Sequence, residues 1–193
     1  RFRLFVVELT PIGVSTLFRE NSEALVDESV DLCDVIPPRT RHALTDALAE
    51  VDDLARKVIL VESFLRQFVP GRGLSKTARR CAAAASRISA SGGLIRVSAL
   101  CDELGVTTRH LQRSFSEVTG LTPKRYVRIV RFNRAFRALA AARPAQLSRV
   151  AIDSGFYDYA HFAHEVFAHT GYYPRELPLE RFAMYRLALC AGE

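Results

Sequence analysis

The sequence predicts a mainly α-helical chain. Two helix-turn-helix subdomains are joined by a long linker helix and preceded by further helices and a short β remnant. Three observations support this fold class. From Pro37 onward, apolar residues recur at steps of three and four, which is the spacing of one helix face. After residue 104, glycines divide this pattern into short helices, and the division occurs twice. Residues 2–9, in contrast, alternate in the manner of a strand buried on both faces.

The β segment lies at the start of the chain. Residues 2–9 are predicted to form one strand, Pro11-Ile12-Gly13 a turn, and Val14–Phe18 a partner strand. A hairpin with so little sequence around it cannot form a sheet core by itself. We therefore expect residues 1–36 to be the C-terminal remnant of a β domain whose beginning precedes residue 1.

Three helices are predicted in residues 37–91. Leu44, Leu48 and Val51 mark the first helix, residues 59–68 the second, and the Ala-rich residues 75–89 the third. The pair Gly92-Gly93 interrupts the helical pattern, so we place a domain boundary there. Residues 37–91 are interpreted as a connector or dimerisation segment.

The last domain, residues 92–193, holds the first helix-turn-helix at about residues 97–118. Its first helix is predicted over Val97–Leu104 and its second over Thr108–Val118, with the sharp bend at Gly105 between them. Thr107 suits the N-cap position of the second helix because its hydroxyl can accept a hydrogen bond from a free backbone N–H group.

A linker helix and a second helix-turn-helix follow. Thr122-Pro123 opens the linker helix, predicted over 123–143, because Thr caps well and Pro is tolerated at the first helical position. Residues 147–170 then repeat the order helix, Gly155 bend and helix, with Asp158 as N-cap. The two halves form an imperfect internal repeat.

Positive charge is concentrated in this last domain. The chain carries 27 Lys and Arg against 21 Asp and Glu, and residues 94–193 carry 14 against 9. Within residues 104–150, ten basic side chains are opposed by one acid, Glu117. Such a concentration on predicted helices indicates a polyanion binder. A solvated helix surface has the same composition, so charge alone does not decide the function.

Several motifs of the last domain carry a resemblance to a known family. They are Leu104-Gly105-Val106-Thr107, His110-Leu111-Gln112-Arg113-Ser114-Phe115, Gly120-Leu121-Thr122-Pro123, and residues 151–162. Through them, residues 94–176 resemble the DNA-binding region of the AraC/XylS family of bacterial transcription regulators. More weakly, residues 9–13 and the helices up to Ser89 resemble the end of a cupin-like sensor domain, so the β remnant would belong to a sensor barrel.

The resemblance implies a cytoplasmic, sequence-specific transcription regulator that binds double-stranded DNA. It also implies a small-molecule effector in the incomplete N-terminal domain, a homodimer, and RNA polymerase as a partner, since most members of the family are activators. The operator sequence, the effector and the sign of regulation cannot be deduced from the residues.

Base-reading side chains are predicted on both second helices. Arg109, Gln112 and Arg113 share one face of the first, at spacings of three and four. Arg can donate two hydrogen bonds to guanine, and Gln pairs in the same way with adenine. The corresponding residues of the second unit are Tyr159, His161 and His164. His164 stands where the family usually has Arg, and Val166 where it has Phe. We call the two helix-turn-helix subdomains the first and second heads, and we expect the second head to bind DNA with lower specificity.

Phosphate contacts are predicted near the start of the first recognition helix and on the linker helix. Backbone N–H groups at a helix N-terminus attract anions, and hydroxyl, imidazole and cationic side chains add to this. The predicted residues are Thr107, Thr108, His110, Lys124, Arg125 and Arg128. The arginines of the linker helix recur every three residues and therefore wind around it, so some must pair with acids elsewhere or stay solvated.

Other functional classes receive little support. The sequence has no Gly-rich phosphate loop, no G-x-S-x-G motif and no HExxH motif, so catalysis is not expected, and neither is a cofactor. His161, His164 and His169 could suggest a metal site, but the nearest Cys in sequence is Cys190 and packing is the better account. The four cysteines form no CxxC pair and are interpreted as reduced thiols. No apolar run is long enough to span a membrane, and no signal peptide is evident. A protein-interaction scaffold that has lost DNA binding stays open as an alternative.

Overall fold

The structure is a computed structural model, and it describes residues 7, 9–18, 22–26, 30–31, 36–67 and 73–178. Within these residues every regular element is a helix and no strand is present, which confirms the mainly α-helical fold class. The described residues divide into two compact units. The first, here the α7 unit, takes those within Leu9–Ala82 and Arg109–Thr122. The second, the α8 unit, takes those within Arg1–Glu8, Ala83–Thr108 and Pro123–Glu193.

The strand predicted over Val14–Phe18 is wrong, because this segment belongs to helix α1, Pro11–Phe18. The preceding Thr10 begins the helix: its Oγ1 accepts a hydrogen bond from Gly13 N at 3.0 Å, and its carbonyl accepts one from Val14 N at 2.9 Å. A capping Thr followed by Pro at the first helical position is a strong start signal, and here it outweighs the turn predicted at Pro11-Ile12-Gly13, which also lies in α1. Of the strand predicted over residues 2–9, all but Val7 and Leu9 lies outside the described residues.

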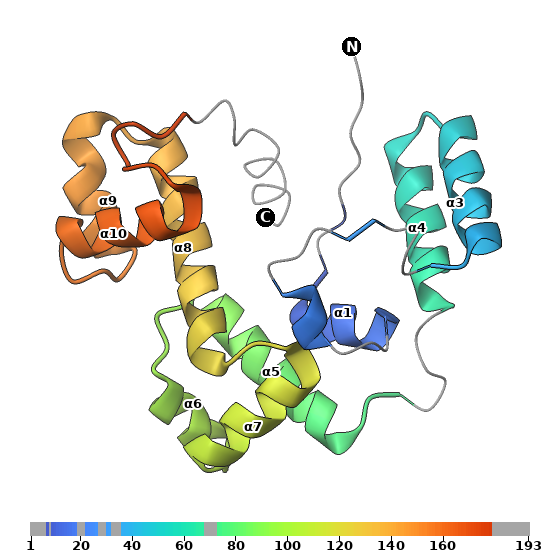
Figure 1. Cartoon of the computed structure of the whole chain (residues 1–193), viewed down its shortest axis with the longest axis horizontal. Helices are drawn as coiled ribbons and strands as arrows, with labels where there is room; N and C mark the ends of the chain where they lie inside the picture. The colour runs from blue at the N-terminus through green and yellow to red at the C-terminus, as the bar shows by residue number, and fades with distance from the viewer. Residues whose placement is uncertain are drawn as a thin grey trace. The chain divides into compact units, whose positions relative to one another are not determined.

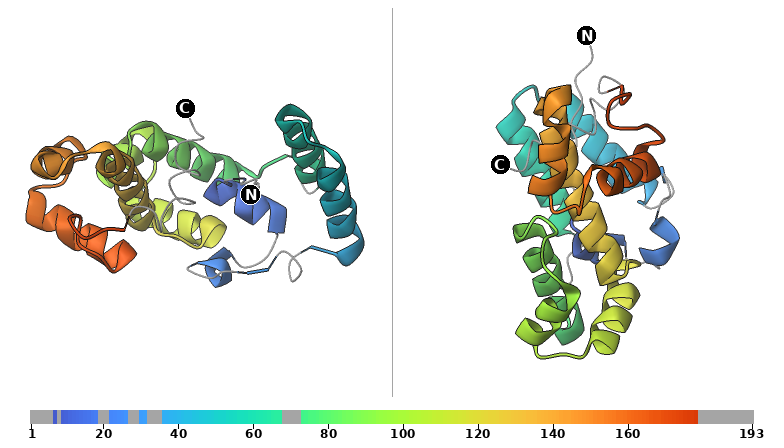
Figure 2. Two further views of the ribbon diagram at one scale, coloured as in Figure 1. Left: turned by 90° about the horizontal axis from the view of Figure 1, so that it is seen from above. Right: turned by 90° about the vertical axis from the view of Figure 1, so that its left-hand side faces the viewer.

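Two helices of the α7 unit lie side by side and form a helical hairpin (Figures 1 and 2). They are α3, Pro38–Glu50, and α4, Leu54–Arg66, which confirms helices in these stretches. Asp53 caps α4, since its Oδ2 accepts a hydrogen bond from Arg56 N at 2.9 Å. The unit also contains a short 3-10 turn at Ser22–Leu25, the first half of α5 and all of α7 except its first residue, Thr108.

Helix α5, Lys76–Ala90, confirms the third predicted helix, and within the α7 unit its Arg80 lies within hydrogen-bond distance of His110 on α7. Its Cys81 is a free, fully buried cysteine. Burial raises the pKa of the Cys81 thiol, against the opposing effects of a hydrogen bond with Ser114 and of the Arg80 charge. Cys101 is also free and buried.

The core of the α8 unit lies where three helices meet. These are α8, Pro123–Ala141; α9, Leu147–Asp153; and α10, Tyr159–Thr170, with a 3-10 turn at Pro144–Gln146 before α9. Figures 1 and 2 show α9 and α10 against the C-terminal half of α8. The cluster includes Phe132, Phe136, Phe156, Phe162 and Val166, each at most 5% exposed. This core packs the second helix-turn-helix against the linker helix.

The glycine pair before α6 is packed closely against α8. Gly93 has φ +74°, and a Cβ atom placed on it would lie 2.6 Å from two backbone atoms of α8, Val127 O and Arg131 N. Both Nε and Nη2 of Arg131 donate to the Gly93 carbonyl, each at 3.2 Å. Just before this turn, the Ser89 and Tyr126 hydroxyls lie within hydrogen-bond distance at 3.0 Å. Residues 89–93 are thus held on the linker helix.

Candidate nucleic-acid interface

The first helix-turn-helix has the predicted elements. Helix α6 spans Val97–Leu104, as predicted, and α7 spans Thr108–Thr119, one residue longer than the prediction. On α7, Arg109, Gln112 and Arg113 are exposed, whereas Leu111 and Phe115 are fully buried. Spacings of three and four residues place each set on one side of a helix. The helix therefore presents a face of two arginines and a glutamine to solvent.

The bends of the two helix-turn-helix subdomains have the same hydrogen bonds. In the first, Gly105 has φ +61°, Val106 N donates to Cys101 O at 3.0 Å, and Gly105 N donates to Asp102 O at 3.2 Å. In the second, Gly155 has φ +82°, and the equivalent bonds to Ala151 O and Ile152 O measure 3.0 and 2.9 Å. Glycine enters this left-handed region without strain, and the paired bonds satisfy the last carbonyls of the helix.

The second helices of the two helix-turn-helix subdomains, α7 and α10, also end alike. Thr119 Oγ1 lies 2.7 Å from Phe115 O, to which it donates, and accepts from Leu121 N at 3.1 Å. In α10, Thr170 Oγ1 makes the same contacts with Val166 O and Tyr172 N, again at 2.7 and 3.1 Å. A left-handed glycine follows each threonine, and a buried proline follows three residues after that glycine. The internal repeat inferred from sequence is therefore a repeat of structure.

Residues 100–178 match a family model described as "Helix-turn-helix domain". Residues 100–178 are a helix-turn-helix domain of the AraC/XylS type. The chain is accordingly a DNA-binding transcription regulator. Searches of curated proteins and of solved structures found no match to the chain. The cupin-like domain expected upstream lies outside the matched residues and stays a prediction.

Two arrangements on α7 bear on how the AraC/XylS-type domain contacts DNA. Arg113 Nε lies 3.5 Å from Glu117 Oε1 in an exposed ion pair one turn apart, which constrains the arginine only weakly. His110 is partly buried, and its Nε2 lies 3.0 Å from Arg80 Nη1 of α5. Because a guanidinium can only donate, His110 Nε2 is the acceptor. Arg80 therefore adds a cation next to a predicted phosphate contact. No local sequence pattern indicates this contact, because the two residues lie 30 positions apart.

The base-reading residues predicted for the second head differ in exposure. His161 and His164 are exposed on α10, and the His161 ring meets the edge of Phe156 at 5.4 Å between centroids. Tyr159 is partly buried and packs against the core, with its ring 6.2 Å from that of Phe162. This head thus offers two exposed imidazoles where the first offers two guanidinium groups and an amide. Their base-reading roles stay predictions.

The basic side chains of α8 have different surroundings. Lys124 and Arg125 are exposed in the first turn of the helix. Arg128 donates two hydrogen bonds to Glu165 of α10, at 2.9 and 3.3 Å, and Arg131 is bonded to the Gly93 carbonyl. The winding of these arginines around the helix predicted such pairing. The sequence carries no signal for the choice of Glu165, which lies 37 residues away from Arg128.

The remaining expectations concern metals and membranes. In the part of the chain that the structure describes, no group of three or more His, Cys, Asp or Glu side chains could hold a metal ion. Within that same part, no helix is both long and apolar enough to cross a membrane.

Asp158 caps α10, as predicted from sequence: its Oδ1 accepts a hydrogen bond from His161 N at 2.7 Å. We expect Asp158→Ala to lower the free energy of unfolding by about 1 kcal/mol, because a free N–H group of the first turn loses its partner. Asp153→Ala is the control, since it removes the same charge from an exposed ion pair with Arg149. Chemical denaturation of the purified chain measures both, and equal small losses would contradict a stabilising cap.

Proposed function

We propose that this chain is an effector-responsive regulator that reads two successive major grooves of double-stranded DNA, one with α7 and one with α10. The repeated bends and helix ends of the two helix-turn-helix units carry this proposal. Two subdomains with the same local geometry, joined by a helix of 19 residues, are suited to two binding boxes in tandem. Successive major grooves on one side of DNA lie about 34 Å apart.

The first head is the specific reader in this proposal. Its Arg109, Gln112 and Arg113 combine exposure with the donor and acceptor groups that discriminate guanine and adenine. Tyr159, His161 and His164 would read the second box with less discrimination, since an imidazole makes fewer hydrogen bonds than a guanidinium. Phosphate contacts are proposed for Thr107, Thr108, His110, Lys124 and Arg125. Arg128 is not among them because its guanidinium donates to the Glu165 carboxylate.

Regulation in this proposal requires partners that bind outside the two heads. A small-molecule effector would bind the upstream domain, a second copy of the chain would pair through the segment before residue 92, and RNA polymerase would contact the DNA-bound protein. Adding RNA polymerase to a template that carries the selected boxes would test the last of these by its effect on transcript yield.

The decisive experiment is selection of bound duplexes from a random DNA pool by the 193-residue chain. We expect two recovered boxes with centres about 10 base pairs apart. A single box would show that α10 contacts the DNA backbone without reading bases. The absence of any enriched sequence would overturn the proposed reading and favour a protein-interaction scaffold.

A further inference from the structure

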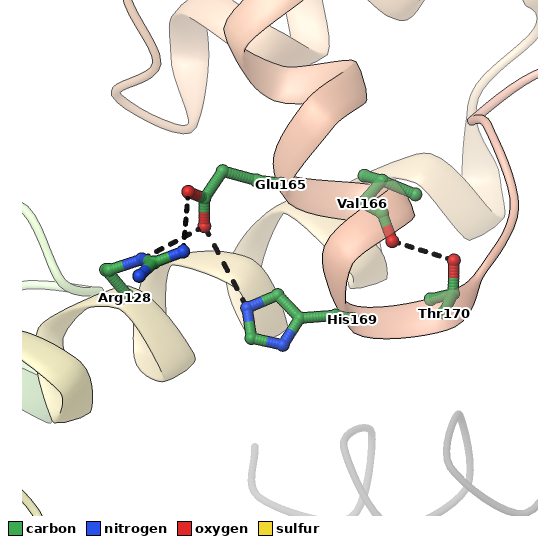
Figure 3. A network of polar contacts seen from close by, with 5 residues as sticks. All are labelled: Arg128, Glu165, Val166, His169 and Thr170. Carbon is green, nitrogen blue, oxygen red and sulfur yellow. Dashed lines mark hydrogen bonds and ion pairs between the residues drawn. The ribbon is translucent and has the colours of Figure 1, made fainter.

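Helices α8 and α10 share a polar contact at the edge of their apolar interface (Figure 3). Arg128 donates through Nη2 to Glu165 Oε1 at 2.9 Å and through Nε to Glu165 Oε2 at 3.3 Å. The Glu165 side chain is only 16% exposed, whereas that of Arg128 is 50% exposed. The carboxylate is therefore largely withdrawn from water, and the guanidinium is its principal compensation.

The contact continues one turn further along both helices. The ring of His169, four residues after Glu165, lies 4.3 Å between centroids from that of Phe132, four residues after Arg128. His169 Nε2 is also 3.9 Å from Glu165 Oε2 (Figure 3). Residues four apart lie on the same side of a helix, so a row of two side chains on α8 faces a row of two on α10.

The Arg128–Glu165 pair gives the α8–α10 interface a directional contact, which its apolar core does not provide. Phe132, Phe162 and Val166 attract the two helices, but burial of apolar surface has no preferred direction and permits more than one rotation of α10. A guanidinium that meets both oxygens of a carboxylate has a narrow geometry. The pair therefore selects one rotation and one height of α10 on α8.

Rotation of α10 bears directly on the proposed base-reading residues of the second head. Glu165 is adjacent to His164 and lies one turn after His161, so all three move together as the helix turns. We propose that Arg128 and Glu165 are positioning residues that fix the orientation of α10 on the linker helix and thereby set the spacing at which the second DNA box is read. This inference rests on the proposed reading of two grooves.

A phosphate role for Arg128 gives the opposite pattern of effects. If Arg128 bound a phosphate, Arg128→Gln would weaken binding to every sequence, and Glu165→Gln would strengthen it by releasing the cation. If the pair positions α10, both substitutions act in the same direction, because either one breaks the same geometry. The two roles are separated by the sign of the Glu165→Gln effect.

The test repeats the selection from random DNA with Arg128→Gln, with Glu165→Gln, and with the exchanged pair Arg128→Glu, Glu165→Arg. The wild-type chain should recover two boxes at one spacing, and each single variant should recover them over several spacings. Affinity for a duplex with the wild-type spacing should fall about tenfold in each single variant and recover in the exchanged pair. Arg149→Gln, which breaks an exposed pair with Asp153 on α9, should leave the spacing unchanged.

Three results would overturn the inference. A wild-type selection with only one box would remove the proposed two-groove reading and this role with it. Two boxes at an unchanged spacing in both single variants would leave the proposed reading intact and remove the positioning role alone. Stronger binding by Glu165→Gln would assign Arg128 to a phosphate. Affinity for a duplex with the first box alone, unchanged from wild type, shows that the first head of each variant is folded, and recovery of a second box shows the same for the second head.

Discussion

Arg113→Ala is expected to weaken binding to the selected DNA by about 1–3 kcal/mol and to relax the preference at one base position. The guanidinium is exposed on α7, next to Gln112 and one turn from Arg109. A paired contact from Arg to the O6 and N7 atoms of guanine supplies discrimination of this size. Repeating the selection with the variant, and titrating both proteins against matched and single-base-changed duplexes, measures the effect.

Arg149→Ala is the matched control for this variant. Arg149 is also exposed and also forms an ion pair one turn away, with Asp153 at 3.5 Å, so its loss removes the same charge and a similar contact. It lies on α9, outside both proposed recognition faces. We expect little change in preference. Equal weakening by Arg113→Ala on all sequences, with a salt dependence reduced by about one unit of slope, would make Arg113 a phosphate contact instead.

Gly93→Ala is expected to lower the free energy of unfolding by about 3–5 kcal/mol. The residue has φ +74°, a region that a side chain enters only with strain. In addition, the new methyl group would lie 2.6 Å from the backbone of α8 at Val127 O and Arg131 N. Backbone atoms in a helix cannot move aside as a flexible side chain can, so the glycine turn and α8 would have to separate.

Gly105→Ala separates the strain of a left-handed backbone from the steric clash with α8. Gly105 has a similar φ of +61°, but a Cβ atom there would have no other heavy atom within 4 Å. It should cost about 1–2 kcal/mol, the conformational penalty alone. Urea denaturation of the two variants and the wild-type chain gives both values. Equal losses would show that the close approach of Gly93 to α8 does not contribute to stability.

Local signals predicted the DNA-binding part of this fold well. The glycine bends, Thr122-Pro123 and Asp158 mark where helices begin and end, so α6 and the start of α7 fell where predicted. Thr10-Pro11 carries the same kind of signal, and α1 shows that the turn predicted at Pro11-Ile12-Gly13 and the strand predicted over Val14–Phe18 are both wrong. A start signal is a hydrogen bond to a particular atom, and the apolar residues Val14, Leu17 and Phe18, at spacings of three and four, also fit one face of a helix.

Contacts between distant residues could not be predicted in the same way. Composition shows that ten basic side chains crowd residues 104–150, and helix geometry shows that they cannot share one face. Neither shows that Arg128 meets Glu165, that Arg131 meets the Gly93 carbonyl, or that Arg80 meets His110. These pairings depend on how helices cross, which one sequence does not encode in any short pattern.

The contacts of α5 determine where a chimera of this protein can be joined. Its Arg80 and Cys81 contact α7, its Ser89 contacts α8, and Gly93 just beyond it is bonded to Arg131. A chimera joined at residue 92 would discard the first three of these contacts and present a foreign chain to the tight turn at Gly93. A fusion of this reading domain to a different upstream module should therefore place its junction before Lys76, and keep α5 with the helices that it supports.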